Sequence, residues 1–298
     1  MSDLRGIYPP IPTPFTEDEK LDQQALRSNL EVWVDTPLAG VVTPGSNSEL
    51  PHLERDEKEQ LWRMCHAVLE PAGKHFIAGT GTDTTRTSIQ LTIRAAELGA
   101  RAALVLTPHF YTPLMTQDAL MSHFTAIADQ SPLDIILYNV PQFTGVVLQP
   151  STVLALADHP RITGIKDSSA NLVNMIRVLS RKPDFQVFSG SGGALLPFIT
   201  MGAVGGIMAL ANIAPHPLQQ MMHDVQAGNM DRARKTQLRL ADLNTAITAK
   251  YGIPGLKHAM DQLGLIGGAS RRPLQPLSPQ ARINIEDLIS KANLKPLI

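Results

Sequence analysis

Short apolar runs alternate with amphipathic stretches along residues 1–228, and this alternation restricts the fold more than any other feature of the sequence. The apolar runs are short and rich in β-branched residues, as buried parallel strands are. The stretches between them carry apolar residues three and four positions apart, as helices packed on a sheet do. The expected strands are 7–8, 40–42, 76–78, 102–106, 134–138, 162–166, 185–188 and 204–208. The expected helices between them include 55–69, 86–98, 117–129, 172–180 and 217–226.

Strands that alternate with helices can form either an open, doubly wound sheet or a closed (β/α)₈ TIM barrel. Periodicity does not separate the two, but the number of strands and their near-even spacing favour the barrel. We therefore predict an α/β protein with a TIM barrel over residues 1–228. The strand pattern stops after Gly228, which predicts a C-terminal helical extension over residues 229–298. The expected helices of this extension are 230–250, 255–263 and 278–294. The proline-rich segment 267–279 is expected to be a loop that closes onto the barrel.

The composition excludes several classes of protein. Apolar residues make up 43% of the chain and charged residues 18%, with a net charge of −1, as in a globular protein with a large core. Because no basic stripe is present, nucleic acid is not expected as a partner. Cys65 is the one cysteine, so neither a disulfide nor a sulfur-based metal site is expected. The N-terminus lacks the apolar segment of a signal peptide, and the apolar stretch 202–214 is too short to span a bilayer. We expect a cytoplasmic protein with no membrane partner.

Lys166 lies at the end of an expected strand, and the reacting groups of a TIM barrel lie at the carboxyl ends of its strands. An amine directed into the barrel mouth loses hydration, which favours its neutral form. A neutral lysine amine can attack the keto carbon of a 2-oxo acid such as pyruvate and form a Schiff base. Considered alone, Lys166 is explained more simply as a solvated lysine at a strand end, so its neighbours decide the interpretation.

Two other strand ends carry residues that could act together with Lys166. Tyr138 ends an expected strand, and alternation can place its hydroxyl inside the barrel near Lys166, where a phenol can transfer a proton. A tyrosine packed at the barrel rim is an equally simple interpretation. Gly45, Ser46 and Asn47 offer backbone N–H groups and short polar side chains that suit a carboxylate, although a tight turn uses the same residues.

Asp167 follows the lysine directly and is expected to point to the other side of its strand. Together with Ser168 or Ser169, it is predicted to cap the next helix. We therefore do not assign Asp167 to the site.

The remaining polar motifs do not indicate a cofactor or a metal. The glycines of segment 79–81 are followed by Thr84 where a dinucleotide fingerprint needs its third glycine, so NAD is not expected. The nine histidines show no paired spacing and no nearby carboxylate cluster, so no metal site is predicted. The glycine-rich segments 189–193 and 205–206 lie where many barrels bind phosphate, and a phosphate-binding enzyme remains an alternative interpretation.

These strand ends resemble the motifs of the dihydrodipicolinate synthase and N-acetylneuraminate lyase superfamily of pyruvate-dependent aldolases, and the resemblance extends through nearly the whole chain. The superfamily motifs Y-N-V-P, G-I-K-(D/E)-(S/A) and G-x-x-G-E correspond to residues 138–141, 164–168 and 45–49. The resemblance implies that Lys166 forms the Schiff base and that Tyr138 relays protons. It also implies that Ser46 and Asn47 hold the carboxylate of pyruvate and that Ile207 lines the pyruvate pocket. A homo-oligomer, either a tetramer or a dimer, is a further expectation from this resemblance.

Departures from the superfamily pattern point to a particular reaction. Ser48 replaces the last glycine of the loop motif, which would reshape the loop if that position required a positive φ. Phe143 stands where the synthases carry an arginine for the second substrate. Phe110 stands where they carry a relay tyrosine, for which the adjacent Tyr111 is the candidate substitute.

The first loop, G-S-N-S-E-L-P-H-L, resembles that of 4-hydroxy-2-oxoglutarate aldolases. We therefore expect a lyase that cleaves a 4-hydroxy-2-oxo acid such as 4-hydroxy-2-oxoglutarate and releases pyruvate. The alternatives are a 4-hydroxy-tetrahydrodipicolinate (dihydrodipicolinate) synthase and a catalytically inactive barrel that binds sugar acids.

Overall fold

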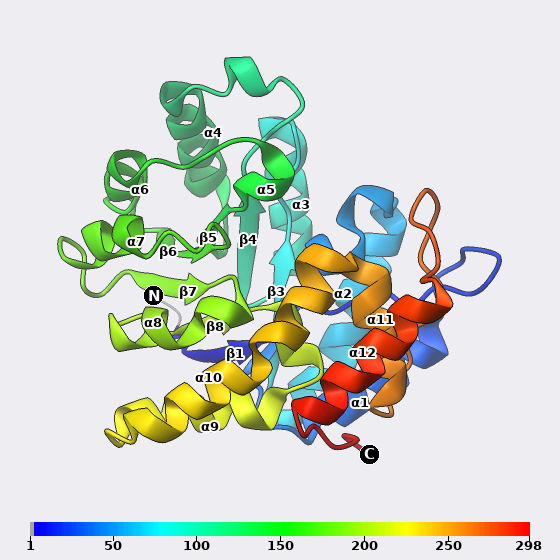
Figure 1. Ribbon diagram of the computed structural model, residues 1–298. Coiled ribbons are helices and arrows are strands. Elements are labelled where there is room, and N and C mark those ends of the chain that lie inside the picture. The colour runs from blue at the N-terminus through cyan, green and yellow to red at the C-terminus, as the bar shows by residue number, and fades with distance from the viewer. Residues whose placement is uncertain (1–2) are drawn as a thin grey trace.

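The structure is a computed structural model that describes residues 3–298, and its parallel strands form one eight-stranded sheet (Figure 1). The strands are β1 (Gly6–Tyr8), β2 (Gly40–Thr43), β3 (His75–Gly79), β4 (Ala102–Leu106), β5 (Asp134–Asn139), β6 (Ile162–Asp167), β7 (Gln186–Ser189) and β8 (Gly205–Ile207). They pair in sequence order from β2 to β8, and β8 pairs with β1. The sheet closes because Ala39 donates a backbone hydrogen bond to Ile7 and Val42 donates one to Pro9. The predicted TIM barrel is therefore confirmed.

Helices cover the outside of the barrel, and a helical extension follows it (Figure 1). The surrounding helices are α1 (Gln23–Val34), α2 (Arg55–Leu69), α3 (Thr85–Glu97), α4 (Gln117–Gln130), α5 (Pro141–Thr144), α6 (Pro150–Leu156), α7 (Leu172–Leu179), α8 (Leu195–Thr200) and α9 (Pro215–Gln226). The extension contains α10 (Met230–Thr245), the π-helical turn η7 (Ala246–Lys250), α11 (Gly252–Gln262) and α12 (Pro279–Lys291). The expected loop at 267–279 contacts the barrel, since Ala269 pairs with Phe15. Among the helices of residues 3–298, none is long and apolar enough to cross a membrane.

Side chains of each strand alternate between two apolar cores. Ile135 and Leu137 of β5 point outward into the core between strands and helices. Ile136 and Tyr138 point inward into a smaller core inside the barrel. Tyr138 is paired with Lys166 across β5 and β6, and paired residues of neighbouring parallel strands point to the same face of the sheet. The strand register therefore directs Lys166 into the barrel beside Tyr138.

Trp62 of α2 connects the helical layer to the end of β2. Its side chain is fully buried, and its indole N–H donates a 2.9 Å hydrogen bond to the carbonyl of Thr43. We expect Trp62→Ala to lower the free energy of unfolding by about 3–5 kcal/mol, because it removes a large buried ring and leaves a cavity. Urea denaturation measures this change. The exposed Met230 provides the control, since Met230→Ala should change stability by less than about 0.5 kcal/mol. An equal loss in both variants would contradict the prediction.

Candidate active site

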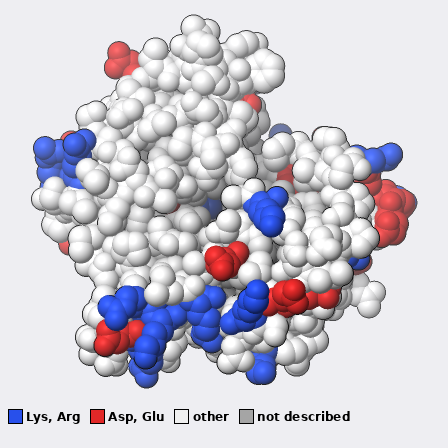
Figure 2. Space-filling view, viewed as in Figure 1, with Lys and Arg blue, Asp and Glu red and all other residues white. Residues whose placement is uncertain are grey.

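A cavity of about 540 Å³ lies at the carboxyl ends of the strands. Residues of the barrel that line it are Pro10, Ser46, Asn47, Tyr138, Gln142, Phe143, Lys166, Ser168, Gly190, Ser191, Gly192, Ile207, Met208 and Ala209. Residues of the extension that line it are Asn244, Ile247, Thr248, Ala249, Gly252, Ile253 and Leu274. Figure 2 shows a hollow near the centre of this face, surrounded mainly by uncharged residues. Within the part of the chain that the structure describes, Lys166 is the one charged residue of the lining.

Lys166 and Tyr138 lie side by side in the lining of this cavity. Lys166 is 2% exposed and Tyr138 is 5% exposed, and the Lys166 Nζ lies 4.0 Å from the centre of the Tyr138 ring. Burial by itself raises the pKa of Tyr138, but the Lys166 cation and hydrogen bonds to Ser46, Lys166 and Ser168 outweigh it and hold this pKa below its usual value. A tyrosine with a lowered pKa gives up its proton more readily than a free phenol, which suits a proton relay.

Ser46 and Asn47 lie on the turn η1 (Ser46–Ser48), which follows β2 at the cavity wall. The Ser46 hydroxyl is 3.4 Å from the Tyr138 hydroxyl. The Asn47 amide donates a 3.2 Å hydrogen bond to the carbonyl of Pro10. Ile207, at the end of β8, lines the same cavity. The structure thus brings Lys166 and these four predicted site residues (Tyr138, Ser46, Asn47 and Ile207) together around one space.

The structure differs from what was expected of Gly45 as a carboxylate-binding residue and of Ser48 as a source of loop strain. The backbone N–H of Gly45 donates a 2.9 Å hydrogen bond to the Ser48 hydroxyl, so this N–H is not free to bind a carboxylate. Ser48 is fully buried and its hydroxyl donates to the carbonyl of Ile11. The left-handed conformation falls on the next residue, Glu49, with φ 59°. Ser48 therefore does not strain the loop but holds it against the N-terminal segment.

Tyr111 is not part of the cavity in this chain. It is 65% exposed, and its ring packs edge-on against Phe110 with 5.1 Å between the ring centres. Its role as a proton relay stays a prediction, because the fold of one chain does not bring its hydroxyl to Tyr138. Phe143, in contrast, lines the cavity while remaining 68% exposed, so the rim carries an apolar ring at this position and not a cation.

Asp167 corrects the prediction of the helix cap. Helix α7 is capped by Asn171, whose side chain accepts a 3.1 Å hydrogen bond from the Asn174 N–H. Asp167 is buried and accepts hydrogen bonds of 2.6 Å from the Asn139 amide and 2.7 Å from the Ser169 hydroxyl. Burial raises its pKa, and these hydrogen bonds partly oppose the rise. The prediction was wrong because the segment between β6 and α7 is long enough for a later residue to cap the helix.

The extension contributes a wall of the cavity that the sequence did not indicate. Asn244, at the end of α10, is 6% exposed, and its Oδ1 has no hydrogen-bond partner among residues 3–298. The π-helical turn that follows brings Ile247 and Thr248 to the same wall. A π-helical turn interrupts the 3.6-residue period of a helix, so a helical pattern in the sequence does not predict which side chains face the cavity.

The glycine-rich loop after β7 belongs to this same cavity. Ser191 accepts a 3.2 Å hydrogen bond from the Gly193 N–H, and a Cβ on Gly192 would lie 2.6 Å from the Asn244 Oδ1. Glycine at position 192 therefore allows the loop to pack directly on α10. Across residues 3–298, the structure contains no group of three or more His, Cys, Asp or Glu side chains arranged to hold a metal ion.

A buried strand-end lysine with a tyrosine at its side, in the mouth of a TIM barrel, defines a class I aldolase, a lyase that acts through a Schiff base. The model of the "Dihydrodipicolinate synthetase family" matches residues 3–292, and the chain belongs to this family. The expected membership of the superfamily of pyruvate-dependent aldolases is therefore confirmed.

Several proteins with known names or solved structures are similar to this chain along almost their whole length. The 4-hydroxy-tetrahydrodipicolinate synthase of Methanothrix thermoacetophila is 35% identical over 97% of this chain and 97% of its own. That of Roseobacter denitrificans is 37% identical over 98% of this chain and 99% of its own. The crystal structure of dihydrodipicolinate synthase from Bacillus anthracis is 30% identical with a TM-score of 0.93, and covers 97% of this chain and 99% of its own. A dihydrodipicolinate synthase from Acinetobacter baumannii, solved with pyruvate, is 31% identical with a TM-score of 0.92, over 98% of this chain and 99% of its own.

Proposed function

We propose that this protein cleaves a 4-hydroxy-2-oxo acid, such as 4-hydroxy-2-oxoglutarate, through a Schiff base on Lys166 and releases pyruvate. The observation that carries the proposal is the position of the Lys166 amine, buried in the cavity and 4.0 Å from the centre of the Tyr138 ring. An amine at this place is protected from bulk water and has a proton-transfer group beside it, as Schiff-base formation requires.

The proposed reaction uses residues of the cavity in a definite order. Ser46 and Asn47 bind the carboxylate of the substrate, and Tyr138 takes a proton from the Lys166 ammonium so that the amine adds to the keto carbon. Tyr138 returns this proton to the former keto oxygen, which leaves as water, and an iminium ion forms. The electrons of the C3–C4 bond move into the iminium as Tyr138 takes the proton of the 4-hydroxyl, so an aldehyde leaves and an enamine remains on the lysine. Tyr138 gives this proton to C3 of the enamine, and water hydrolyses the resulting iminium to release pyruvate and regenerate the amine.

A second candidate is 4-hydroxy-tetrahydrodipicolinate synthase, and the names of the relatives favour it. It shares the pyruvate half of the mechanism, and the Acinetobacter baumannii enzyme was solved with pyruvate. The two candidates differ in the aldehyde. Phe143 supports the lyase, because an apolar, largely exposed ring at the cavity rim offers no cation to the carboxylate of aspartate semialdehyde.

Trapping with borohydride tests the part that both candidates share. We expect incubation with pyruvate and borohydride to reduce the imine and attach pyruvate to Lys166, because reduction makes the transient bond permanent. Peptide mass spectrometry locates the adduct. An adduct on another residue, or none, would contradict the Schiff-base mechanism.

Two activity assays then separate the candidates. One measures pyruvate released from 4-hydroxy-2-oxoglutarate, and the other measures the cyclic product from pyruvate and aspartate semialdehyde. We expect kcat/KM to be at least about a hundredfold higher in the first assay, since a missing ionic contact in a binding site costs about two powers of ten. The variant Phe143→Arg should narrow this difference by improving the second reaction. Faster formation of the cyclic product by the unmodified protein would favour the synthase instead.

A further inference from the structure

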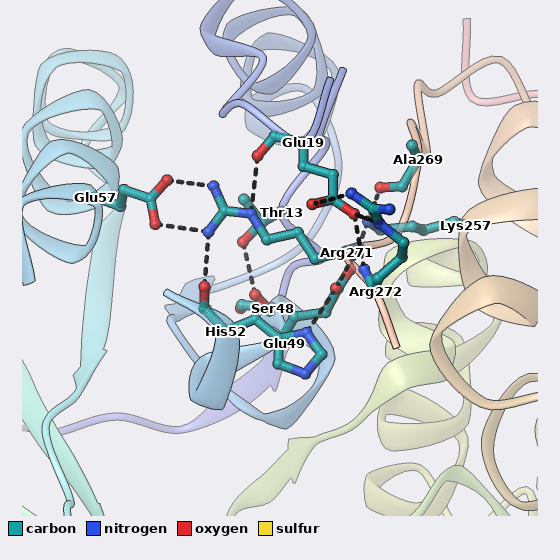
Figure 3. A network of polar contacts seen from close by, with 10 residues as sticks. All are labelled: Thr13, Glu19, Ser48, Glu49, His52, Glu57, Lys257, Ala269, Arg271 and Arg272. Carbon is teal, nitrogen blue, oxygen red and sulfur yellow. Dashed lines mark hydrogen bonds and ion pairs between the residues drawn. The ribbon is translucent and has the colours of Figure 1, made fainter. Parts of the chain in front are cut away.

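Glu49 lies at the centre of a buried network of polar contacts behind the carboxylate-binding turn (Figure 3). It is 1% exposed and has a left-handed backbone conformation, which non-glycine residues adopt only when their surroundings hold them there. Its Oε1 accepts a 2.7 Å hydrogen bond from the Lys257 Nζ. Its Oε2 accepts a 2.9 Å hydrogen bond from the backbone N–H of Arg271 and lies 3.2 Å from the His52 Nδ1. All these contacts act on the residue that directly follows the turn η1.

Lys257 ties this carboxylate to the C-terminal extension. It lies on α11, is 2% exposed, and donates a second hydrogen bond of 2.5 Å to the carbonyl of Ala269. Burial lowers its pKa, and the charge of Glu49 opposes this effect. Because neither charge of the pair reaches water, each depends on the other for its stability. Lys257 does not line the cavity described above, so its place in the structure is not explained by contact with substrate.

Arg271 holds the same turn from a second direction (Figure 3). Its guanidinium donates hydrogen bonds to both carboxylate oxygens of Glu57 on α2, one of them 2.7 Å long. It also donates to the carbonyls of His52, at 2.7 Å, and Glu19, at 2.9 Å. A planar guanidinium with this many partners has little freedom to move. The backbone N–H that reaches Glu49 is therefore held in place as well.

We propose that Lys257 and Arg271 are positioning residues, which hold Glu49 so that Ser46 and Asn47 stay at the cavity wall where the carboxylate of pyruvate binds. This inference rests on the pyruvate site of the proposed function. It makes the C-terminal extension part of the binding machinery, although its charged residues do not touch the substrate. Lys166 lies on β6 and Tyr138 on β5, outside the network, so weakening the network should affect pyruvate binding more than the reaction of the bound substrate.

Kinetics of borohydride trapping in the full chain test this inference. We expect Lys257→Met to raise the pyruvate concentration for half-maximal adduct formation on Lys166 by about tenfold or more, because small displacements of binding groups have large effects. The maximal rate should fall less than about threefold, since the reacting residues keep their positions. The exposed Lys291 on α12 is the matched control, and Lys291→Met should leave both values unchanged. If Lys257→Met folds and its pyruvate concentration for half-maximal adduct formation is unchanged, the inference is overturned.

A second variant covers the case in which Lys257→Met does not fold. Glu49→Gln combined with Lys257→Met removes both buried charges, so no unpaired carboxylate is left. We expect this double variant to fold and to show the same raised half-saturation, because the turn has still lost its anchor. A folded double variant with normal half-saturation would contradict a positioning role.

Hydrogen exchange separates a failure of this inference from a failure of the proposed function. We expect the amides of residues 45–50 to exchange faster in Lys257→Met, while those of β3 stay protected. This readout does not need pyruvate. Absence of an adduct in the unmodified protein would therefore overturn the proposed function and the role in pyruvate binding, even if faster exchange showed that Lys257 anchors the turn. Unchanged exchange at 45–50 would overturn the positioning role and leave the proposed function intact.

Discussion

Replacing Lys166 by arginine is expected to lower turnover by at least about a thousandfold, as the loss of a covalent nucleophile does. Arginine keeps a long side chain and a positive charge at this buried strand end, so the fold should survive. Its guanidinium stays protonated and cannot add to a keto carbon. The measurements are kcat for pyruvate release and the mass of the protein after borohydride trapping, which should show no adduct.

The other buried lysine provides a sharp control. Lys257 is as buried as Lys166, since both residues are 2% exposed, but its amine is paired with Glu49 and does not face the cavity. If burial alone made a lysine reactive, pyruvate would attach to both. We expect the adduct on Lys166 only. Turnover of Lys166→Arg within about tenfold of the unmodified protein would contradict the assignment.

Tyr138→Phe is expected to lower kcat by about a hundredfold to ten-thousandfold, the usual contribution of a positioned proton-transfer group. Phenylalanine keeps the ring beside Lys166, so the buried packing survives and only the hydroxyl is lost. The lowered pKa of Tyr138 supports this role, since Lys166 and Ser46 stabilise its ionised form. Steady-state kinetics measure the loss, and trapping should still give an adduct, formed more slowly.

Tyr251→Phe is the matched control for the loss of a hydroxyl. The Tyr251 hydroxyl accepts a 2.9 Å hydrogen bond from Asn284, and the residue does not line the cavity. We expect kcat to change less than about twofold in this variant. A similar loss in the two variants would show that the effect of Tyr138→Phe is structural. Full activity of Tyr138→Phe would instead assign the proton transfer to another group.

The sequence predicted the strands and helices, because each leaves a local pattern of apolar residues. Each strand of a closed barrel is buried on both faces, which leaves a short apolar run, and each covering helix leaves a 3.6-residue pattern. The proximity of Lys166 and Tyr138 could also be predicted, because both lie at the ends of strands and parallel neighbours bring their carboxyl ends together. For Asp167 the same local reasoning failed, since its partner is Asn139 on the neighbouring strand rather than the next helix.

The parts of the site that could not be predicted depend on contacts between distant segments. Lys257 and Glu49 are 208 residues apart in the chain, and neither lies in a pattern that names the other. Asn244 and Thr248 face the cavity through the path of the extension, which includes a π-helical turn. Tyr111 was predicted to relay protons because it adjoins Phe110, but the loop that carries it leaves the side chain exposed to solvent.

The sequence by itself determined the barrel and the placement of Lys166, Tyr138 and the turn at residues 46–48 around one space, because these follow from burial and hydrogen bonding within and between adjacent strands. Only the tertiary structure decided that Ser48 and Glu49 anchor that turn instead of straining it, and that the C-terminal extension forms one wall of the cavity. The physical reason is that a buried charge must find its partner wherever the folded chain brings one. Lys257 meets Glu49 through the packing of the extension on the barrel, which no local period of the sequence encodes.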